Sequence, residues 1–294
     1  MIQIFILTHN RVGSLKFSIN SVLDQLLKTS NFEIIISDNS TNDETKELIE
    51  ERYSNLNNLV YRKRIPTSPL NHFNKVLSEV TADYFMLFHD DDIMYPNMLS
   101  ILYNSIIKDE NLLAVGCNAR LVKKGKVSRT FFNESEDIQI QNIDQLVIKY
   151  LNFSHAPFPS YMYRKKVAEV VSFDLKKGGK YCDVAFLLDI ASLGSLAMLK
   201  VPLMNYYIHE GQDSASHDSE QQNRLIKYML NVSSITKKSY ILKKYRLTNF
   251  YNKISFLGNR VSSDRWTKIM ILFLKYSPFF LFPRIVLKRI LNKI

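Results

Sequence analysis

Cysteine is scarce in this chain of 294 residues, which contains only Cys117 and Cys182. The two lie far apart and show neither the spacing of a metal site nor that of a redox motif. The sequence therefore predicts free thiols in a reducing cytosol and not a disulfide-stabilised secreted domain. The amino terminus also lacks the basic segment and the small-residue cleavage site of a signal peptide, so residues 2–7 are expected to form a first strand.

Long apolar runs and glycine-rich phosphate loops are missing as well. Lys275 and Pro278 interrupt the apolar stretch 266–282, so no segment reaches the roughly 18–20 residues that a membrane span needs. Neither standard glycine-rich phosphate motif occurs, and the chain has no internal repeat and no low-complexity linker. A nucleotide site in this chain would therefore have to be built on carboxylates and a metal ion.

Positive charge is concentrated at one end of the chain. The formal net charge is +11, but residues 237–294 hold fourteen Lys and Arg against one acidic residue, a net of +13. Residues 1–236 hold 25 basic and 27 acidic residues, a net of −2. A cationic tail on a nearly neutral body indicates an anionic partner, either a membrane surface or a nucleic acid. With 46% hydrophobic residues the body can bury a substantial core, which excludes a disordered chain.

Short apolar strands alternate with amphipathic helices along the first part of the chain. Strands are predicted at residues 2–7, 32–37, 59–62 and 84–88, and helices at residues 14–27, 44–53 and 71–79. Further strands are predicted at residues 112–117, 126–131, 161–164 and 197–201, and further helices from about residue 96, at 143–150 and at 183–193. Because parallel strands need crossover connections, this alternation predicts an α/β fold with a doubly wound, mostly parallel sheet.

Three consecutive carboxylates, Asp90, Asp91 and Asp92, follow the predicted buried strand 84–88. Carboxylates packed this closely repel one another, and a hard divalent cation with oxygen ligands is the simplest way to keep them ionised. On an extended backbone Asp90 and Asp92 point the same way, so we expect these two to hold the metal. A solvated acidic turn is the alternative, but open α/β sheets bind their ligands at the carboxyl ends of strands, which favours the metal.

Polar residues also follow the first two predicted strands. Residues 8–11, 38–40 and 89–92 should converge in one crevice, because the carboxyl ends of parallel strands meet at one edge of a sheet. Asp38 is suited to a nucleobase N–H or to ribose hydroxyls, and the backbone amides after Thr8 can meet phosphate or sugar oxygens. An isolated Asp38-Asn39-Ser40 would be read as an ordinary Asx turn.

The order and spacing of these motifs resemble the nucleotide-sugar glycosyltransferases of family 2, which have the GT-A fold. The resemblance covers residues 1 to about 215 and rests on five segments: Thr8-His9-Asn10-Arg11, Ser37-Asp38-Asn39-Ser40 with Asp43, Asp90-Asp91-Asp92, Tyr181-Cys182-Asp183 at the start of a helix, and Tyr206-Tyr207-Ile208-His209. Cys182 stands where many members of the family have Glu. The resemblance implies an inverting glycosyltransferase with a divalent metal ion, Mn²⁺ or Mg²⁺, as cofactor.

The resemblance also assigns roles to residues. Asp183 is the expected catalytic base, because an acceptor hydroxyl is a poor nucleophile until a base removes its proton. Without the resemblance, Asp183 would be read as an acidic residue that interacts with the helix dipole, and Asp189 as a solvated or structural carboxylate. The expected donor-binding residues are Thr8, Asn10, Arg11, Asp38, Asn39, Asn74, Asp90 and Asp91. The expected metal ligands are Asp90, Asp92 and His209, and the expected acceptor-side residues are His155, Ser160 and Tyr161. His72, His89 and His155 could equally be packed, hydrogen-bonded histidines.

The sequence further predicts how the chain is divided. Residues 1–215 are expected to form the GT-A catalytic domain, with a nucleotide-sugar half at 1–110 and an acceptor half at 111–215. Residues 216–294 are expected to form a helical, basic, amphipathic tail. Wound as a helix, residues 284–294 place aliphatic side chains on one side and basic side chains on the other, as in a helix that lies on an anionic membrane. A tail that packs on the catalytic domain is the alternative.

Together these features predict a bacterial enzyme that uses a nucleoside-diphosphate sugar, with UDP as the expected nucleotide. The expected acceptor is a lipid-linked saccharide in the assembly of a surface polysaccharide such as O-antigen or capsule. The expected location is the cytoplasmic face of the inner membrane, bound peripherally through the tail. A nucleic-acid-binding protein is a rival, but the tail has aliphatic stripes where aromatic stacking platforms would be expected. A nucleotidyltransferase is a second rival, which the missing glycine-rich loop disfavours.

Overall fold

The computed structural model describes residues 1–28, 31–209 and 218–257. The chain divides into two compact units, Met1–Ile235 and Thr236–Ile294. The sequence had placed the division at residue 215. No helix in the described part of the chain is long and apolar enough to cross a membrane.

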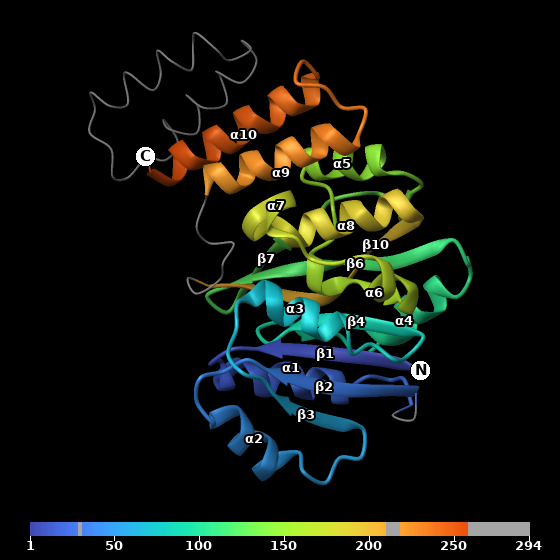
Figure 1. Ribbon diagram of the computed structural model, residues 1–294, viewed down its shortest axis with the longest axis vertical. Coiled ribbons are helices and arrows are strands. Elements are labelled where there is room, and N and C mark those ends of the chain that lie inside the picture. Colours follow the sequence, from blue (N-terminus) through green and yellow to red (C-terminus); the bar gives the residue numbers. More distant parts are fainter. Residues whose placement is uncertain (29–30, 210–217, 258–294) are drawn as a thin grey trace. The chain divides into compact units, whose positions relative to one another are not determined.

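The first unit is built on a ten-stranded mixed sheet (Figure 1). Its strands are β1 (Ile2–Thr8), β2 (Phe32–Asp38), β3 (Leu59–Lys63), β4 (Tyr84–His89), β5 (Ile93–Met94), β6 (Leu112–Lys123), β7 (Lys126–Thr130), β8 (Ile138–Ile140), β9 (Met162–Arg164) and β10 (Ser195–Ile208). The main path runs β3-β2-β1-β4-β9-β6-β10-β5, with β7 paired to β6 and β8 to β10. The alternation of strands and helices therefore gave the fold class correctly.

Helices connect these strands. The described ones in the first unit are α1 (Val12–Leu23), α2 (Glu44–Arg52), α3 (Pro69–Leu77), α4 (Met98–Ile106), α5 (Ile143–Leu151), α6 (Lys165–Val170), α7 (Leu175–Gly178), α8 (Cys182–Leu193) and α9 (Ser219–Val232). The short 3₁₀ turns Phe158–Ser160 and Gly179–Tyr181 lie beside β9 and α8 in the sequence. Helices α7, α8 and α9 contact one another beyond the β6–β10 half of the sheet (Figure 1).

The amino-terminal half has the parallel pairing that the sequence predicts. β1 pairs in parallel with β2 and β4, in a register that sets Thr8 opposite Asp38 and Leu7 opposite His89. The strands β1, β2 and β4 are almost wholly buried, since helices cover both faces of a parallel sheet. Their carboxyl ends therefore meet at one edge, as expected.

Two strands in the second half exceed their predicted lengths. β6 and β10 pair in parallel over most of their length, with register shifts on either side of Pro202. Proline cannot donate to the ladder, so the sequence pattern breaks at this position although the pairing resumes beyond it. As a result β10 continues to Ile208 and carries Tyr206 and Tyr207 to the same edge as the β1 and β4 ends.

The second unit is described to residue 257. It contains α10 (Tyr240–Leu257), which has several basic residues and no acidic one. The segment 284–294, for which the sequence predicts an amphipathic helix, lies outside the described residues.

Candidate active site

A cleft of about 580 Å³ opens at the carboxyl ends of β1 and β4. It is lined by residues from the first strand ends, the start of α3, the turn after β4 and the start of α8, with others nearby: Leu7, Thr8, His9, Arg11, Asn39, Thr67, Ser68, Pro69, Leu70, His72, Phe73, His89, Asp90, Asp91, Phe158, Phe173, Leu175, Lys180, Tyr181, Cys182, Asp183, Tyr206 and Gln221. The cleft therefore brings together segments that are far apart in the sequence, from Leu7 to Gln221.

The carboxylate run forms a turn and does not continue the strand. β4 ends at His89, Asp90 and Asp91 occupy the turn, and β5 begins at Ile93. Because the backbone turns, the alternation of an extended chain does not apply to these residues. The structure therefore groups Asp91 with Asp92, where the sequence had paired Asp90 with Asp92.

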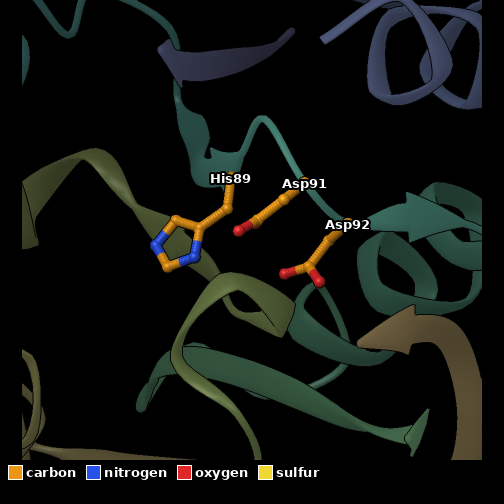
Figure 2. Close-up of side chains that lie close together, drawn as sticks. All are labelled: His89, Asp91 and Asp92. Carbon is orange, nitrogen blue, oxygen red and sulfur yellow. The ribbon is translucent and has the colours of Figure 1, made fainter. Parts of the chain in front are cut away.

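Figure 2 shows the side chains of His89, Asp91 and Asp92 close together. One ligand atom from each of the three lies within 4.8 Å of the others. Asp90 and Asp92 are 2% and 0% exposed, and each has one carboxylate oxygen with no hydrogen-bond partner among the described residues. Such buried, unsatisfied oxygens are costly unless a cation binds them. This donor set, mainly carboxylate oxygens, fits a hard divalent cation such as Mn²⁺ or Mg²⁺.

Burial raises the pKa of both Asp90 and Asp92. For Asp90 the guanidinium of Arg11 opposes this effect, with Arg11 Nη1 3.3 Å from Asp90 Oδ1 and 3.1 Å from Asp91 Oδ2. For Asp92 the neighbouring Asp91 charge raises the pKa further, while the backbone N–H of Tyr207, 3.1 Å from Oδ1, lowers it. Both carboxyl groups therefore keep a proton up to a higher pH than an exposed aspartate does.

His209 lies at the end of β10, next to this turn. Its Nε2 is 2.8 Å from Asp91 Oδ2. The expected metal ligand therefore contacts the carboxylate cluster, although it does so through Asp91. His89, which the sequence had left open as a packed histidine, belongs to the cluster itself. Its position directly before the acidic run is the signal that could have identified it.

Asp183 stands in the first turn of α8 and lines the same cleft as Asp90 and Asp91. Its Oδ1 accepts a hydrogen bond of 2.8 Å from the Val184 backbone N–H. Burial raises its pKa above the ordinary value, and the Val184 bond and nearby His89 partly offset that effect. A carboxylate with a raised pKa that opens onto a cleft is a good candidate for a general base. Asp189, further along α8, is instead paired with Lys177.

Among the expected donor-binding residues, Thr8, Arg11 and Asn39 line the cleft. Asn10 has a positive φ of 53°, and its Oδ1 accepts a hydrogen bond from the Thr41 N–H, so that it ties the ends of β1 and β2 together.

Two other expected donor residues are engaged inside the protein. Asp38 is fully buried; its Oδ1 accepts from Ser40 N–H at 2.9 Å and its Oδ2 from the Tyr61 hydroxyl at 2.8 Å. Asn74 exchanges two hydrogen bonds with the backbone of Phe173. Neither is among the cleft-lining residues, and their roles in donor binding stay predictions.

The expected acceptor-side residues are not among those that line the cleft. Ser160 and Tyr161 are fully buried, with the Tyr161 ring against Gly116. The His155 ring stacks on Tyr150 at 4.9 Å, and burial lowers its pKa. Phe158 from the same segment lines the cleft. Within a segment of mixed aromatic and proline residues, the sequence carries no periodicity that would show which side chain faces outward.

Several cleft residues were given no role in the site by the sequence prediction, although His72 and Tyr206 were named there. His72, Phe73, Phe173, Lys180, Tyr206 and Gln221 all line it. Most come from the amino-terminal ends of α3, α8 and α9 or their approaches. Helix starts at the ligand-binding edge of an α/β sheet are the signal that could have drawn attention to them.

Comparison with known proteins gives consistent matches. The family model described as glycosyl transferase family 2 matches residues 3–171. The poly(ribitol-phosphate) beta-N-acetylglucosaminyltransferase TarP of Staphylococcus aureus is 22% identical over 241 residues, covering 81% of this chain and 72% of TarP. The abequosyltransferase RfbV of Salmonella typhimurium is 27% identical over 149 residues, covering 48% of this chain and 44% of RfbV. A GalNAc(5)-diNAcBac-PP-undecaprenol beta-1,3-glucosyltransferase of Campylobacter jejuni is 25% identical over 153 residues, covering 51% of this chain and 48% of that protein.

Solved structures agree with these sequence matches. Residues 1–349 of S. aureus TarS in complex with UDP-GlcNAc superpose with a TM-score of 0.65 at 19% identity, over 90% of this chain and 77% of that one. The complex of the same TarS fragment with UDP gives a TM-score of 0.63 at 15% identity, over 91% of this chain and 77% of that one. At these identities the likeness shows a shared fold, which is the GT-A fold that the sequence predicts.

Proposed function

Because the chain belongs to glycosyltransferase family 2, we propose that it inverts an anomeric centre while moving a sugar from UDP to an acceptor hydroxyl. Glycosyl transfer is common to the named relatives. UDP as the nucleotide that carries the sugar is supported by the TarS complexes with UDP-GlcNAc and UDP. The observation that carries the proposal is that one cleft contains Asp183 and the carboxylate turn.

The proposed reaction has a simple proton balance. The proton of the acceptor O–H passes to a carboxylate oxygen of Asp183 as the acceptor oxygen bonds to the anomeric carbon. The bond between that carbon and the diphosphate oxygen breaks, and UDP leaves. Attack from the side opposite UDP inverts the centre, so an α-linked donor gives a β-linked product. The raised pKa of Asp183 makes it a stronger base than an ordinary aspartate.

The carboxylate turn is the proposed site of a divalent cation. Asp91, Asp92 and His89 offer ligand atoms within 4.8 Å of one another, and Asp90 lies beside them with one unsatisfied oxygen. A bound Mn²⁺ or Mg²⁺ would act as a Lewis acid that stabilises the charge of the departing diphosphate. Arg11, which contacts Asp90 and Asp91, adds a fixed positive charge at the same place.

The acceptor is proposed to be a lipid-linked saccharide in surface-glycan assembly. The name of the Campylobacter relative contains a PP-undecaprenol acceptor, and that of TarP a poly(ribitol-phosphate) one. We propose that the basic carboxyl-terminal segment, net +13 from residue 237, binds an anionic membrane surface and brings the enzyme to such an acceptor. Full-length protein should then bind vesicles that contain anionic lipid, and not zwitterionic ones, with a Lys243→Glu, Lys244→Glu double variant binding less.

The transfer itself is tested with UDP-sugars, Mn²⁺ and a polyprenyl-diphosphate-linked saccharide. The expected result is release of UDP together with a new glycosidic bond whose anomeric configuration, read by NMR, is opposite to that of the donor. A product of retained configuration would refute the single-base mechanism. Release of inorganic pyrophosphate in place of UDP would identify a nucleotidyltransferase.

A further inference from the structure

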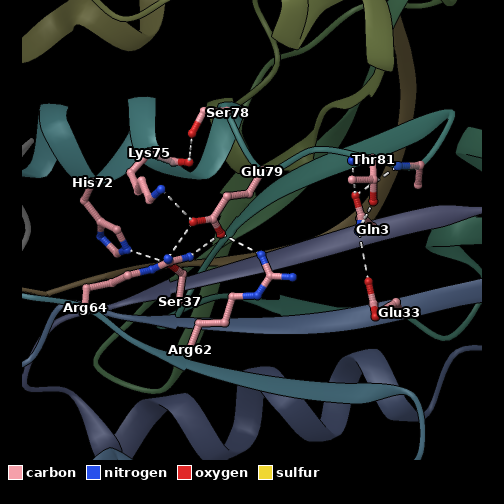
Figure 3. Close-up of polar contacts among 11 residues, drawn as sticks. Gln3, Glu33, Ser37, Arg62, Arg64, His72, Lys75, Ser78, Glu79 and Thr81 are labelled. Carbon is pink, nitrogen blue, oxygen red and sulfur yellow. Dashed lines mark hydrogen bonds and ion pairs between the residues drawn. The ribbon is translucent and has the colours of Figure 1, made fainter.

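His72, on α3, lines the cleft without a role in the chemistry proposed above. It is 5% exposed, and its Nε2 lies 2.8 Å from the hydroxyl oxygen of Ser37, near the end of β2. Figure 3 shows the imidazole at the end of a polar network that runs through Ser37 and Arg64 to Glu79. Of these four residues, only His72 is among those that line the cleft.

The network fixes Arg64 firmly. Its two terminal nitrogens donate to the two carboxylate oxygens of Glu79 at 2.7 and 2.6 Å, and Arg62 donates to the same carboxylate at 2.6 Å. Burial would raise the pKa of Glu79, but the hydrogen bonds from Arg64 and Arg62 outweigh it and hold that pKa at about 2. Glu79 is therefore ionised throughout the physiological pH range, and the bidentate pair sets the direction of the Arg64 Nε–H.

That Nε–H decides which nitrogen of His72 carries the proton. Arg64 Nε donates to Ser37 Oγ at 3.0 Å. Arginine cannot accept a hydrogen bond, so the Ser37 hydroxyl donates its own proton to another group. Ser37 is fully buried, and His72 Nε2 is the acceptor within reach among the described residues. The reverse arrangement would leave the buried Ser37 hydroxyl without an acceptor, which is unfavourable. His72 Nε2 therefore accepts, and the proton sits on Nδ1.

The imidazole is also kept neutral. Burial, and then the positive charge of Arg64, lower the pKa of His72 to about 4. At neutral pH the ring thus offers one fixed donor, Nδ1–H. In the described part of the chain Nδ1 has no hydrogen-bond partner, and it is not among the polar atoms sealed inside the protein. Figure 3 places this nitrogen on the side of the ring away from Ser37.

The cleft-lining residues that neighbour His72 in the sequence are uncharged: Thr67, Ser68, Pro69, Leu70 and Phe73. The charged lining residues come from other segments: Arg11 precedes α1, Asp90 and Asp91 form the turn after β4, and Lys180 and Asp183 lie at the start of α8. A neutral donor in an uncharged wall suits a neutral acceptor on a flat group, and not a phosphate. We propose that His72 Nδ1–H donates a hydrogen bond to a carbonyl oxygen of the nucleobase of the donor, and that Ser37 and Arg64 fix the tautomer that makes this possible. The inference rests on the proposed nucleotide-sugar function and names a residue that reads the base.

Two substitutions of His72 separate the two nitrogens. In His72→Gln the amide can occupy the Nε2 position and keep the bond to Ser37, but nothing replaces the Nδ1 donor. In His72→Asn the amide can occupy the Nδ1 position, but the bond to Ser37 is lost. We expect the Gln variant to bind UDP roughly 5- to 10-fold more weakly in the presence of Mn²⁺, as one neutral hydrogen bond is lost, and the Asn variant to stay within about 3-fold of wild type.

Inorganic diphosphate with Mn²⁺ serves as the matched probe without a base. Its affinity should be the same for wild type and His72→Gln, and an equal loss for both ligands would overturn a contact with the base. Equal UDP affinity of wild type and His72→Gln would also overturn it, while leaving the transferase function intact. Wild-type protein that binds no nucleoside diphosphate would instead refute the proposed function.

The tautomer of His72 can also be measured directly in the wild-type protein. In ¹⁵N NMR spectra of the wild-type full-length protein, the proton of His72 should be on Nδ1, and this signal should shift when UDP is added. Ser37→Ala should let the two tautomers mix without changing the fold. A His72 proton on Nε2 in wild type, or an Nδ1 signal that does not shift when UDP is added, would overturn the inference.

Discussion

Asp92 should behave unlike an ordinary buried aspartate: its replacement by Asn is expected to stabilise the protein when no metal is bound. The side chain is fully buried, one of its oxygens has no partner among the described residues, and the Asp91 charge stands beside it. Asparagine keeps an oxygen that can accept from the Tyr207 N–H and removes the charge. The substitution therefore relieves repulsion while it preserves the hydrogen bond.

The magnitude follows from the spacing of the carboxylates. With ligand atoms up to 4.8 Å apart, the repulsion between two unit charges is roughly 3 kcal/mol at an effective dielectric constant of about 20. Part of this is already relieved in wild type by protonation and by Arg11, so we expect Asp92→Asn to gain about 1–2 kcal/mol. For a domain of this size each kcal/mol corresponds to about 2–4 °C in Tm.

The gain should depend on pH. Burial raises the pKa of Asp92 in the folded protein above its value in the unfolded chain, so folding takes up a proton in that range. Stability is then present at low pH and is lost as the pH rises through the folded pKa. The advantage of Asp92→Asn should accordingly be largest at high pH and should vanish as the pH falls.

Thermal melts with EDTA and with Mn²⁺ test this prediction. Wild type should gain about 2.7 kcal/mol when free Mn²⁺ is about 100 times its Kd, and Asp92→Asn should gain much less. Asp189→Asn is the control, because it removes a carboxylate that is already paired with Lys177, and it should lose stability with or without metal. The reasoning would be refuted if Asp92→Asn were less stable than wild type in EDTA, or if neither Mn²⁺ nor Mg²⁺ changed the wild-type Tm.

Three further predictions concern the base, the core and the network behind the cleft. Asp183→Asn should lower turnover about 10²- to 10⁴-fold with UDP affinity retained. Because activity rises as this carboxylate loses its proton, the acid limb of the wild-type kcat profile should lie above the ordinary Asp pKa of 3.8. A pH–rate profile with an unshifted acid limb would contradict the assignment. Gly116→Ala should lower the free energy of urea unfolding by about 1–3 kcal/mol, since the new Cβ would lie 2.7 Å from the buried Tyr161 ring. A change within error of zero would show that the ring can move. Glu79→Gln should lower the free energy of unfolding by about 1–3 kcal/mol at pH 7, because Arg64 loses its charged partner. The difference from wild type should shrink as the pH falls below 4.5, where wild-type Glu79 begins to lose the stability that its lowered pKa provides.

The sequence predicted the elements of the fold well where a simple period governs them. The parallel strands β1, β2 and β4 appear in the sequence as mostly apolar runs, and their polar ends meet because the parallel register sets Thr8 opposite Asp38. The length of β10 was underestimated because Pro202 interrupts the pattern without ending the pairing. β5, with two residues, is too short to produce a period at all.

The candidate site was predicted in its segments more than in its side chains. Arg11, Asp90, Asp91 and Asp183 do line one cleft. The grouping of Asp91 with Asp92 could not be read from alternation, because a turn replaces the extended chain there. Whether a residue such as Ser160 or Asp38 faces the cleft or the core depends on tertiary packing, which no local pattern encodes.

The most direct test of the central claim is a panel of nucleoside-diphosphate sugars incubated with the full-length protein and Mn²⁺. The slow release of nucleoside diphosphate is measured with and without EDTA, for wild type and for Asp92→Ala. The account predicts metal-dependent release from a UDP-sugar that is lost in the variant. No release, together with no metal-dependent nucleotide binding by wild type, would contradict it.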